Sequence, residues 1–404
     1  MAPSRMVNAA AAWSRGSVHP TDATIAARRI LTFAATHTAL WRHRAPADYT
    51  NRSWPELPTM SRTDIHERFE ETVADGFVTR NEAVRRWLHV SESDSDDLHV
   101  FLSAGADRIL VPFVTDAEAW DAIVEATLRR FFMAGVVPTA ELRVAFVGTS
   151  DPRHTLPRIA RGLGSMIRPA IAGFQEGIES MIEQVSSFEP DVLFGLPSAI
   201  STLARAQLSG RLRLTLQACF SSGEALAVAD RQQIERAWSL NVFDAYQSTE
   251  GGVVASQCSA GRLHVNEDLV QLELEGGASL LTNLRNHAQP IVRYRLSDQL
   301  GLEREACPCG LATQTCHLSR GRSAVMWRLP ALAGDDVLVH PVVIRSVLDG
   351  FGTAMSPQID VTGNEIGVQL APELKSSAVL DQLREALERA GVDVKRLGIA
   401  WRDP

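Results

Sequence analysis

Two short blocks of the sequence carry the side chains best suited to chemistry. Residues 246–251 read Tyr-Gln-Ser-Thr-Glu-Gly, and residues 293–298 read Arg-Tyr-Arg-Leu-Ser-Asp. The first block offers the hydroxyl of Thr249 and the carboxylate of Glu250 near one phosphate group. The second ends in Asp298, which can accept hydrogen bonds from both hydroxyls of a ribose. Together the blocks predict a nucleotide site, whereas the first block alone would equally fit a loop with a helix cap.

Cysteine and histidine give a separate signal. Cys258 and His264 lie close together in the sequence, and Cys307 and Cys309 follow as Cys-Pro-Cys. Three thiolates and one imidazole suit a closed tetrahedral Zn²⁺ site. Two alternatives remain at this point: Cys316 replaces one of the ligands, or the cysteines are unlinked and reduced. Cys219 lies in an apolar run and is predicted to be a core residue.

The elements that must position these residues follow an α/β pattern. Buried strands are predicted at residues 99–102, 143–147, 192–195, 214–219 and 241–246. Helices are predicted between them at residues 117–132, 178–188, 199–208 and 227–238. Such alternation favours a sheet of parallel strands covered by helices. Between residues 263 and 294 short strands replace the helical pattern, which predicts a β-rich subdomain.

The last part of the chain has a different pattern. Helices are predicted at residues 341–348 and 377–390, and strands at residues 358–361, 366–370 and 397–401. The sequence therefore predicts two domains, a large one at residues 1–322 and a small α+β one at residues 323–404.

Composition excludes several classes of function. The chain has 404 residues, of which 45% are hydrophobic and 22% charged, and this is typical of a soluble globular protein. A net charge of -8 argues against a nucleic-acid surface. No apolar run is long enough to span a bilayer, and the N-terminus lacks the pattern of a signal peptide. We expect a cytoplasmic monomer or homodimer without a membrane or nucleic-acid partner.

The two blocks, in this order and followed by Gly321 and Arg322, resemble the adenylate-forming superfamily. The resemblance is closest to its phenylacetate-CoA ligase-like branch. It implies catalytic roles for Thr249 on phosphate oxygens and for Glu250 on Mg²⁺, and it puts Arg322 at the hinge between two half-reactions. It also implies that Tyr246 lies against adenine and that Asp298 binds the ribose.

The resemblance further implies the remaining binding residues and the cofactors. A segment at residues 221–225 is similar to one that lies against adenine in the family, although Ser-Gly-Glu is also a common turn. The implied nucleotide-binding residues are Ser222, Gly223, Glu224, Tyr246, Gln247, Ser248, Thr249, Asp298 and Arg108. The implied cofactors are ATP, Mg²⁺ and a structural Zn²⁺ held by Cys258, His264, Cys307 and Cys309.

Two segments depart from the family pattern. The loop expected to hold the β- and γ-phosphates corresponds to residues 103–108, where most of the hydroxyls and glycines of the family are missing. Arg108 either compensates as a phosphate ligand or pairs with Asp107. The C-terminal Gly-Lys segment of the family is also missing, and the only lysines are Lys375 and Lys395.

The resemblance implies ATP-dependent activation of a small carboxylic acid and transfer of its acyl group to CoA, an amine or a carrier protein. Association of the family with natural-product pathways implies a biosynthetic role. The alternative is a member that no longer adenylates, and acts as an acyltransferase, a condensing enzyme or a binding scaffold. Phe194, Phe220, Ala245 and the neighbourhood of Ser222 are predicted to line a flat apolar pocket, which favours an aryl or short-chain acid.

Overall fold

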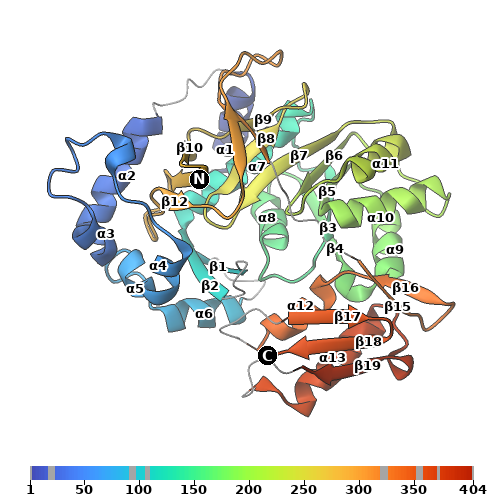
Figure 1. The fold of residues 1–404 in the computed structure, drawn as a ribbon. Coiled ribbons are helices and arrows are strands. Elements are labelled where there is room, and N and C mark those ends of the chain that lie inside the picture. Colours follow the sequence, from blue (N-terminus) through green and yellow to red (C-terminus); the bar gives the residue numbers. More distant parts are fainter. Residues whose placement is uncertain are drawn as a thin grey trace.

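The computed structural model describes residues 2–16, 23–90, 97–104, 110–318, 326–351, 358–370 and 374–402. A nine-stranded mixed sheet forms the centre of this part of the chain (Figure 1). Its parallel half has the strand order β4-β3-β5-β6-β7. These strands are β3 (Arg143–Gly148), β4 (Arg168–Gly173), β5 (Val192–Gly195), β6 (Ala218–Ser222) and β7 (Val242–Ser248). The predicted α/β class with parallel strands is confirmed.

Helices cover both faces of the parallel half. Alternate residues of a strand point to opposite sides of the sheet, so each face has its own apolar side chains to bury. On one face Phe146 and Phe194 pack in one core with residues of α7 and α8. On the other face Val147 and Leu193 pack in a second core with residues of α9, α10 and α11. The helices are α7 (Ala117–Met133), α8 (Thr155–Leu163), α9 (Ile178–Phe188), α10 (Pro197–Leu208) and α11 (Val228–Trp238).

The antiparallel half of the sheet continues from β7 in the order β8-β9-β14-β13. Its strands are β8 (Gly252–Gln257), β9 (Leu263–Val265), β13 (Leu300–Glu303) and β14 (Thr315–Leu318). A separate three-stranded sheet contains β10 (Val270–Glu275), β11 (Ala278–Asn283) and β12 (Tyr294–Arg295). The predicted β-rich subdomain after residue 263 is therefore confirmed.

The strand predicted at residues 99–102 does not belong to the parallel sheet. It is β1 (Leu98–Ala104), which pairs antiparallel with β2 (Leu110–Asp116) in a two-stranded sheet. Buried amide side chains hold this hairpin in place: the Val114 N–H donates to Gln289 at 2.9 Å, and Asn286 donates to the Val114 carbonyl at 2.6 Å. The strand itself was predicted, but its place outside the parallel sheet was not, because these partners come from a loop far along the chain.

The strand predicted at residues 214–219 was placed too early. Strand β6 begins at Ala218, and Leu214 lies in an extended segment before it. The Gln207 side chain explains the difference, because its amide oxygen accepts from the Leu214 N–H at 2.9 Å and its amide nitrogen donates to the Leu214 carbonyl at 3.1 Å. The backbone of Leu214 is thus satisfied by a helix side chain rather than by a neighbouring strand.

Helices also form the N-terminal part of the chain, where α1 packs along α7. They are α1 (Pro3–Ser14), α2 (Ala23–His37), α3 (Ala39–Arg44), α4 (Arg62–Glu67), α5 (Phe69–Thr72) and α6 (Arg80–Leu88), with the 3₁₀ turn η1 (Trp54–Glu56). The start of α4 is fixed by a capping box, in which Ser61 and Asp64 each accept from the other's backbone N–H. Within the described ranges no helix is both long and apolar enough to cross a bilayer.

The C-terminal unit, defined here as residues 326–402, lies beside the edge of the large sheet that carries β4 (Figure 1). Its helices and strands agree with the predicted ones to within two residues, except for a hairpin of β15 and β16 that was not predicted. The elements are β15 (Trp327–Pro330), β16 (Asp336–Val339), α12 (Val342–Asp349), β17 (Gln358–Thr362), β18 (Glu365–Gln369), α13 (Ser377–Arg389), η4 (Val394–Arg396) and β19 (Gly398–Trp401).

One apolar core is shared between the C-terminal unit and the large sheet. Phe174 and Val185 from the sheet side belong to the same buried cluster as Val343 and Leu383 from α12 and α13. The two parts also approach at the backbone, because a Cβ atom at Gly177 would lie 3.0 Å from the Arg389 carbonyl oxygen. Gly177 has a φ of +88°, so the position requires glycine for its conformation as well as for its space.

Candidate active site

A cavity of about 1030 Å³ lies at the carboxyl ends of the parallel strands. This edge of an open α/β sheet is where ligands usually bind. Pockets for small molecules measure about 300–1,000 Å³, so this one has room for a nucleotide together with a small acid. The predicted nucleotide-site residues that line it are Ser222, Gly223, Glu224, Tyr246, Gln247, Ser248, Thr249, Glu250 and Asp298.

The two chemical blocks meet at a hydrogen bond. Tyr246, at the end of β7, donates from its phenol to Oδ2 of Asp298 at 3.0 Å. Burial raises the pKa of Tyr246, and the negative charge of Asp298 raises it further. The phenol therefore stays protonated, and it fixes the carboxylate that was predicted to bind a ribose. The family role expected of Tyr246, contact with adenine, stays a prediction.

Glu250 lies in the tight connection between β7 and β8, not at a helix cap. The Ser248 hydroxyl accepts from the Gly251 N–H at 3.0 Å, and Asn283 donates to the Glu250 carbonyl at 3.1 Å. Burial raises the pKa of Glu250, and the charge of Asp298 adds to this, while Arg62 opposes it. A carboxylate in this position is stabilised by a bound cation, which fits the predicted metal role.

Gly252 shapes the wall beside Glu250. It has a φ of +68°, and a Cβ atom there would lie 2.6 Å from the Ile123 side chain. Both Gly252 and Ile123 line the cavity. The glycine thus allows the connection after β7 to pass directly over α7.

Glu224 connects the cavity to the C-terminal unit. Its carboxylate accepts from Nε2 of His340 at 2.9 Å and from the Ser198 N–H at 3.2 Å. The His340 tautomer follows from geometry, because Nδ1 accepts from the Val342 N–H at 3.0 Å and the proton must be on Nε2. Burial would raise the pKa of Glu224, but the bonds from His340 and Ser198 outweigh it and lower the pKa. Both oxygens of Glu224 are therefore engaged by the protein.

Two charged residues near the cavity were not predicted. Asp244 lines the cavity, accepts from the Ser221 hydroxyl at 2.7 Å, and has its pKa raised by burial. Arg130 is buried beneath it, with its guanidinium 4.6 Å from the ring centre of Phe194. Arg130 donates to the Ser221 carbonyl at 2.8 Å, and burial lowers its pKa to about 10. An arginine inside an otherwise apolar helix face was the sequence signal for this arrangement.

Arg62 and Tyr294 were also missed as site residues, and both line the cavity. Arg62 is the first residue of α4 and donates to the Ser103 carbonyl. Burial raises the pKa of the Tyr294 phenol, and this phenol interacts by charge and hydrogen bonding with both Glu250 and Arg62. Because Arg62 and Glu250 are far apart in sequence, no local pattern indicates that they share a site.

The lining of the cavity also includes large apolar side chains. Phe101, Trp120 and Phe194 line it, and Phe101 stacks on Trp120 with ring centres 5.8 Å apart. Ala245 also lines the cavity as predicted, but Phe220 does not. The Phe220 ring packs instead 4.9 Å from that of Phe131 in the core between the sheet and α7.

The arginines of the second block have separate environments. Arg293 has 1% of its surface exposed, and it donates to the carbonyls of Pro55 and Leu57 and to Glu275. Arg295 is half-exposed at the cavity rim. Arg295 is thus a partly solvated strand charge, whereas Arg293 joins the second block to the segment before α4.

Several predicted residues lie elsewhere. Arg108 and Arg322 are outside the described residues. Lys375 donates to the Arg402 carbonyl at 3.1 Å, and Lys395 lies in η4. Neither lysine lines the cavity.

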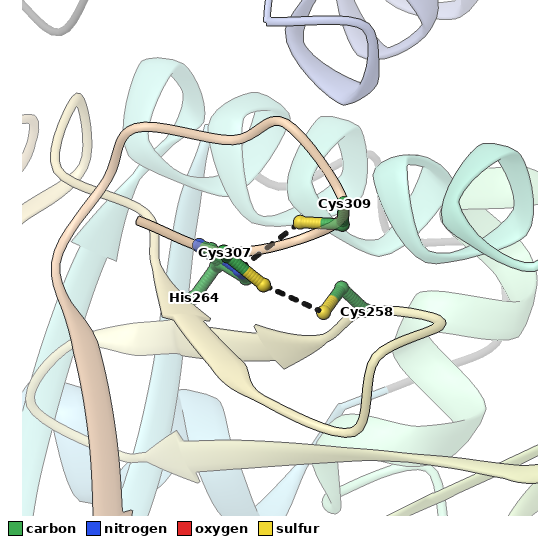
Figure 2. A group of neighbouring side chains, drawn as sticks. All are labelled: Cys258, His264, Cys307 and Cys309. Carbon is green, nitrogen blue, oxygen red and sulfur yellow. Dashed lines mark hydrogen bonds between the residues drawn. The ribbon is translucent and has the colours of Figure 1, made fainter. Parts of the chain in front are cut away.

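The predicted zinc ligands come together in one cluster (Figure 2), and none of them lines the cavity. Cys258 and His264 flank the turn between β8 and β9, and Cys307 and Cys309 lie on the loop before β14. All four ligand atoms are within 4.8 Å of one another, with 3.8 Å between Sγ of Cys258 and of Cys307 and 3.3 Å between Sγ of Cys309 and Nε2 of His264. Thiolates 2.3 Å from a common tetrahedral centre would be about 3.8 Å apart.

The surroundings of the cluster fit the same chemistry. Nδ1 of His264 lies 3.0 Å from the Thr313 hydroxyl, so an Nδ1–H donating to Thr313 leaves the Nε2 lone pair facing the thiols. Burial and the neighbouring thiols raise the pKa of Cys309 to about 12, so joint ionisation requires a cation. Cys316 is buried in β14 outside the cluster, and Cys219 is buried in β6 as predicted.

No protein-family model matches the sequence, but the sequence is similar to individual proteins. It is 28% identical over 314 residues to the phenylacetate-coenzyme A ligase of Thermus thermophilus, across 73% of this chain and 65% of that protein. It is 29% identical over 126 residues to the indoleacetate–lysine synthetase of Pseudomonas savastanoi, across 30% of this chain and 32% of that protein. CapK of Staphylococcus aureus is 25% identical over 155 residues, across 37% of this chain and 34% of CapK. The aligned segments thus span about a third to just under two thirds of these relatives.

Solved structures share the fold. A 2-hydroxyisobutyryl-CoA ligase in the postadenylation state, in complex with 2-HIB-AMP, superimposes with a TM-score of 0.56 at 17% identity, across 94% of this chain and 85% of that one. Its open conformation, in complex with 2-HIB-AMP and CoA, gives a TM-score of 0.54 at 18% identity, across 93% and 86%. The chain has the fold of the adenylate-forming superfamily, and the resemblance predicted from its sequence is confirmed.

Proposed function

We propose that this protein activates a small carboxylic acid as its acyl-adenylate and transfers the acyl group to a thiol or an amine. The observation that carries the proposal is the convergence of Thr249, Glu250 and Asp298 on one cavity large enough for AMP and an acid. The names of two relatives add support, because one is a ligase to coenzyme A and the other a synthetase that joins an acid to lysine.

The proposed chemistry has two steps. A carboxylate oxygen of the acid attacks the α-phosphorus of ATP, the bond to the bridging oxygen breaks, and pyrophosphate leaves. The acceptor then attacks the acyl carbon, AMP leaves, and the proton of the acceptor passes to solvent. Mg²⁺ bound to Glu250 would neutralise phosphate charge in the first step. Thr249 would donate to phosphate oxygens, and Asp298, held by Tyr246, would accept from the ribose hydroxyls.

The acid would lie against the large apolar side chains of the cavity, and an aryl acid fits this surface best. Trp120, Phe101 and Phe194 offer flat apolar surface, and aromatic rings pack favourably against such surfaces. Two of the relatives are named for arylacetates, phenylacetate and indoleacetate. We therefore place aryl and arylacetic acids before short aliphatic acids as substrates.

Cys258, His264, Cys307 and Cys309 form the proposed structural Zn²⁺ site. The spacing of their ligand atoms and the hydrogen bond from Nδ1 of His264 to the Thr313 hydroxyl support this assignment. The cluster is separate from the cavity, so the metal would join the β8–β9 turn to the loop before β14 rather than take part in the reaction.

A protein that no longer adenylates is the second candidate, and one observation favours it: neither Lys375 nor Lys395 lines the cavity. Such a protein would act as an acyltransferase or condensing enzyme on a preformed activated acid, or as a binding scaffold.

The experiment that separates the candidates is pyrophosphate release with Mg·ATP over a panel of benzoic, arylacetic, amino and short-chain acids. Hydroxylamine in a parallel series traps the activated acyl group as its hydroxamate. Adenylation predicts equal amounts of pyrophosphate and hydroxamate with at least one aryl acid. Pyrophosphate release that no acid increases would contradict the proposal and support the second candidate.

A further inference from the structure

The cavity is rich in acidic groups for a site that must hold phosphates. Among the described residues that line it, the carboxylates are Glu224, Asp244, Glu250 and Asp298, and the guanidiniums are Arg62 and Arg295. A phosphate chain needs positive charge from the protein as well as from a metal ion. The two arginines are therefore the described side chains to consider.

Arg295 is poorly placed for this purpose. It is half-exposed at the rim, where its guanidinium lies 3.8 Å from Glu275 and donates to the Thr59 hydroxyl at 3.3 Å. An exposed ion pair of this kind contributes little and is screened by salt.

Arg62 is better placed, because it lies between Glu250 and the end of β1. Its guanidinium donates to the carbonyl of Ser103, a residue that itself lines the cavity. Its positive charge acts on Glu250 and also on Tyr294, the neighbouring phenol. A guanidinium has five N–H donors in a planar fork, a geometry that matches phosphate oxygens.

The backbone that carries Arg62 is held on both sides. The Met60 N–H donates to the Arg293 carbonyl at 3.1 Å, and the Arg295 N–H donates to the Met60 carbonyl at 2.9 Å. Arg44 pairs with Asp64 of the capping box and donates to the Thr59 carbonyl at 3.0 Å. Arg62 is thus positioned beside Tyr294 before any ligand arrives, which reduces the entropy that binding would cost.

We propose that Arg62 binds the phosphate chain of ATP beside Glu250 and contributes positive charge to a cavity whose described lining is rich in carboxylates. This inference rests on the proposed function, since it assigns a further residue to the same reaction. In the reaction Arg62 would stabilise the charge that develops as the α-phosphorus is attacked and pyrophosphate leaves.

The test compares Arg62→Met and Arg62→Lys with the wild-type protein. Calorimetric titration measures binding of Mg·ATP and of adenosine to the full chain, and pyrophosphate release gives KM for ATP and for the acid. We expect Arg62→Met to weaken Mg·ATP binding about 10- to 100-fold, the loss of one charge-assisted contact. Binding of adenosine and KM for the acid should change less than about twofold, and Arg62→Lys should recover part of the ATP affinity.

Arg68→Met is the matched control, because Arg68 ends the same helix, pairs with Glu71 on the surface and does not line the cavity. Equal weakening of ATP and adenosine binding in Arg62→Met would indicate a structural role and overturn the inference, as would unchanged ATP binding. If the wild-type protein itself binds no Mg·ATP, the proposed function fails as well. Wild-type binding with an unaffected Arg62→Met variant refutes only the role of Arg62.

Discussion

The phenol of Tyr246 donates to the carboxylate of Asp298 at 3.0 Å, although 52 positions separate the two residues in the sequence. Tyr246 lies near the end of β7 in the large sheet, and Asp298 follows β12 of the small β10–β12 sheet. Their contact brings the two chemical blocks into one site. It also means that the group proposed to hold the ribose is oriented by the block proposed to hold the phosphate.

Replacing Glu250 by Gln should abolish Mg²⁺-dependent turnover. The amide keeps the size of the carboxylate but is a weak ligand for Mg²⁺, so we expect pyrophosphate release to fall at least about 100-fold. The measurement is acid-dependent pyrophosphate release over a range of Mg²⁺ concentrations. Glu305→Gln, at an exposed site away from the cavity, is the control. An active Glu250→Gln variant would remove the carboxylate from the proposed metal site.

Asp298 should determine recognition of the ribose. We expect Asp298→Asn to raise KM for ATP about tenfold, because charged hydrogen bonds are worth about 1.5–3 kcal/mol. The wild-type protein should prefer ATP to 2′-deoxy-ATP, and the variant should lose most of this preference. Tyr246→Phe, which removes the bond to Asp298, should have a smaller effect in the same direction. An unchanged preference in Asp298→Asn would place the ribose elsewhere.

The protein should contain about one Zn²⁺ per chain. Cys307→Ser should lower the metal content and the thermal unfolding temperature, since a structural metal binds the folded state preferentially. Elemental analysis after dialysis, together with thermal melts, measures both effects. Cys316→Ala is the control, because Cys316 is buried near the cluster without belonging to it. A wild-type protein without zinc, or equal metal loss in both variants, would contradict the assignment.

His99 should make stability depend on pH. Burial, with the charges of Arg158 and Arg161, lowers the pKa of His99 from 6.5 to about 4. The unfolded chain therefore binds more protons than the folded one between these values, and the free energy of unfolding should fall as the pH falls from about 6.5 to about 4. The full shift corresponds to at most roughly 3 kcal/mol.

Urea unfolding of the wild-type protein and of His99→Gln across this pH range measures the effect of His99. The glutamine variant should lose less stability on acidification than the wild-type protein. Parallel pH profiles for the two proteins would show that His99 is not responsible.

The parallel sheet could be predicted because its strands are short buried runs, such as Val192–Gly195, separated by amphipathic helices. The metal cluster could be predicted because three of only five cysteines occur with one histidine in two short segments. Both signals are local, so each is visible in a single sequence.

Other features depend on contacts between distant segments. The hairpin of β1 and β2 is held by Gln289 and Asn286, and the segment at Leu214 is held by Gln207. Arg62 was not predicted as a site residue, because nothing near it in sequence reveals that Glu250 is its neighbour. Phe220 was predicted to be a pocket wall but lies in the core, since apolar character alone does not distinguish a core position from a pocket wall.

The apolar cluster shared by Phe174, Val343 and Leu383 has a consequence for any swing of the C-terminal unit. Separation of the two parts would expose buried apolar side chains to water, and hydration of apolar surface raises the heat capacity. If nucleotide binding rotates the unit, calorimetry should therefore show a large heat-capacity change of binding. The enthalpy of ligand binding would then change steeply with temperature.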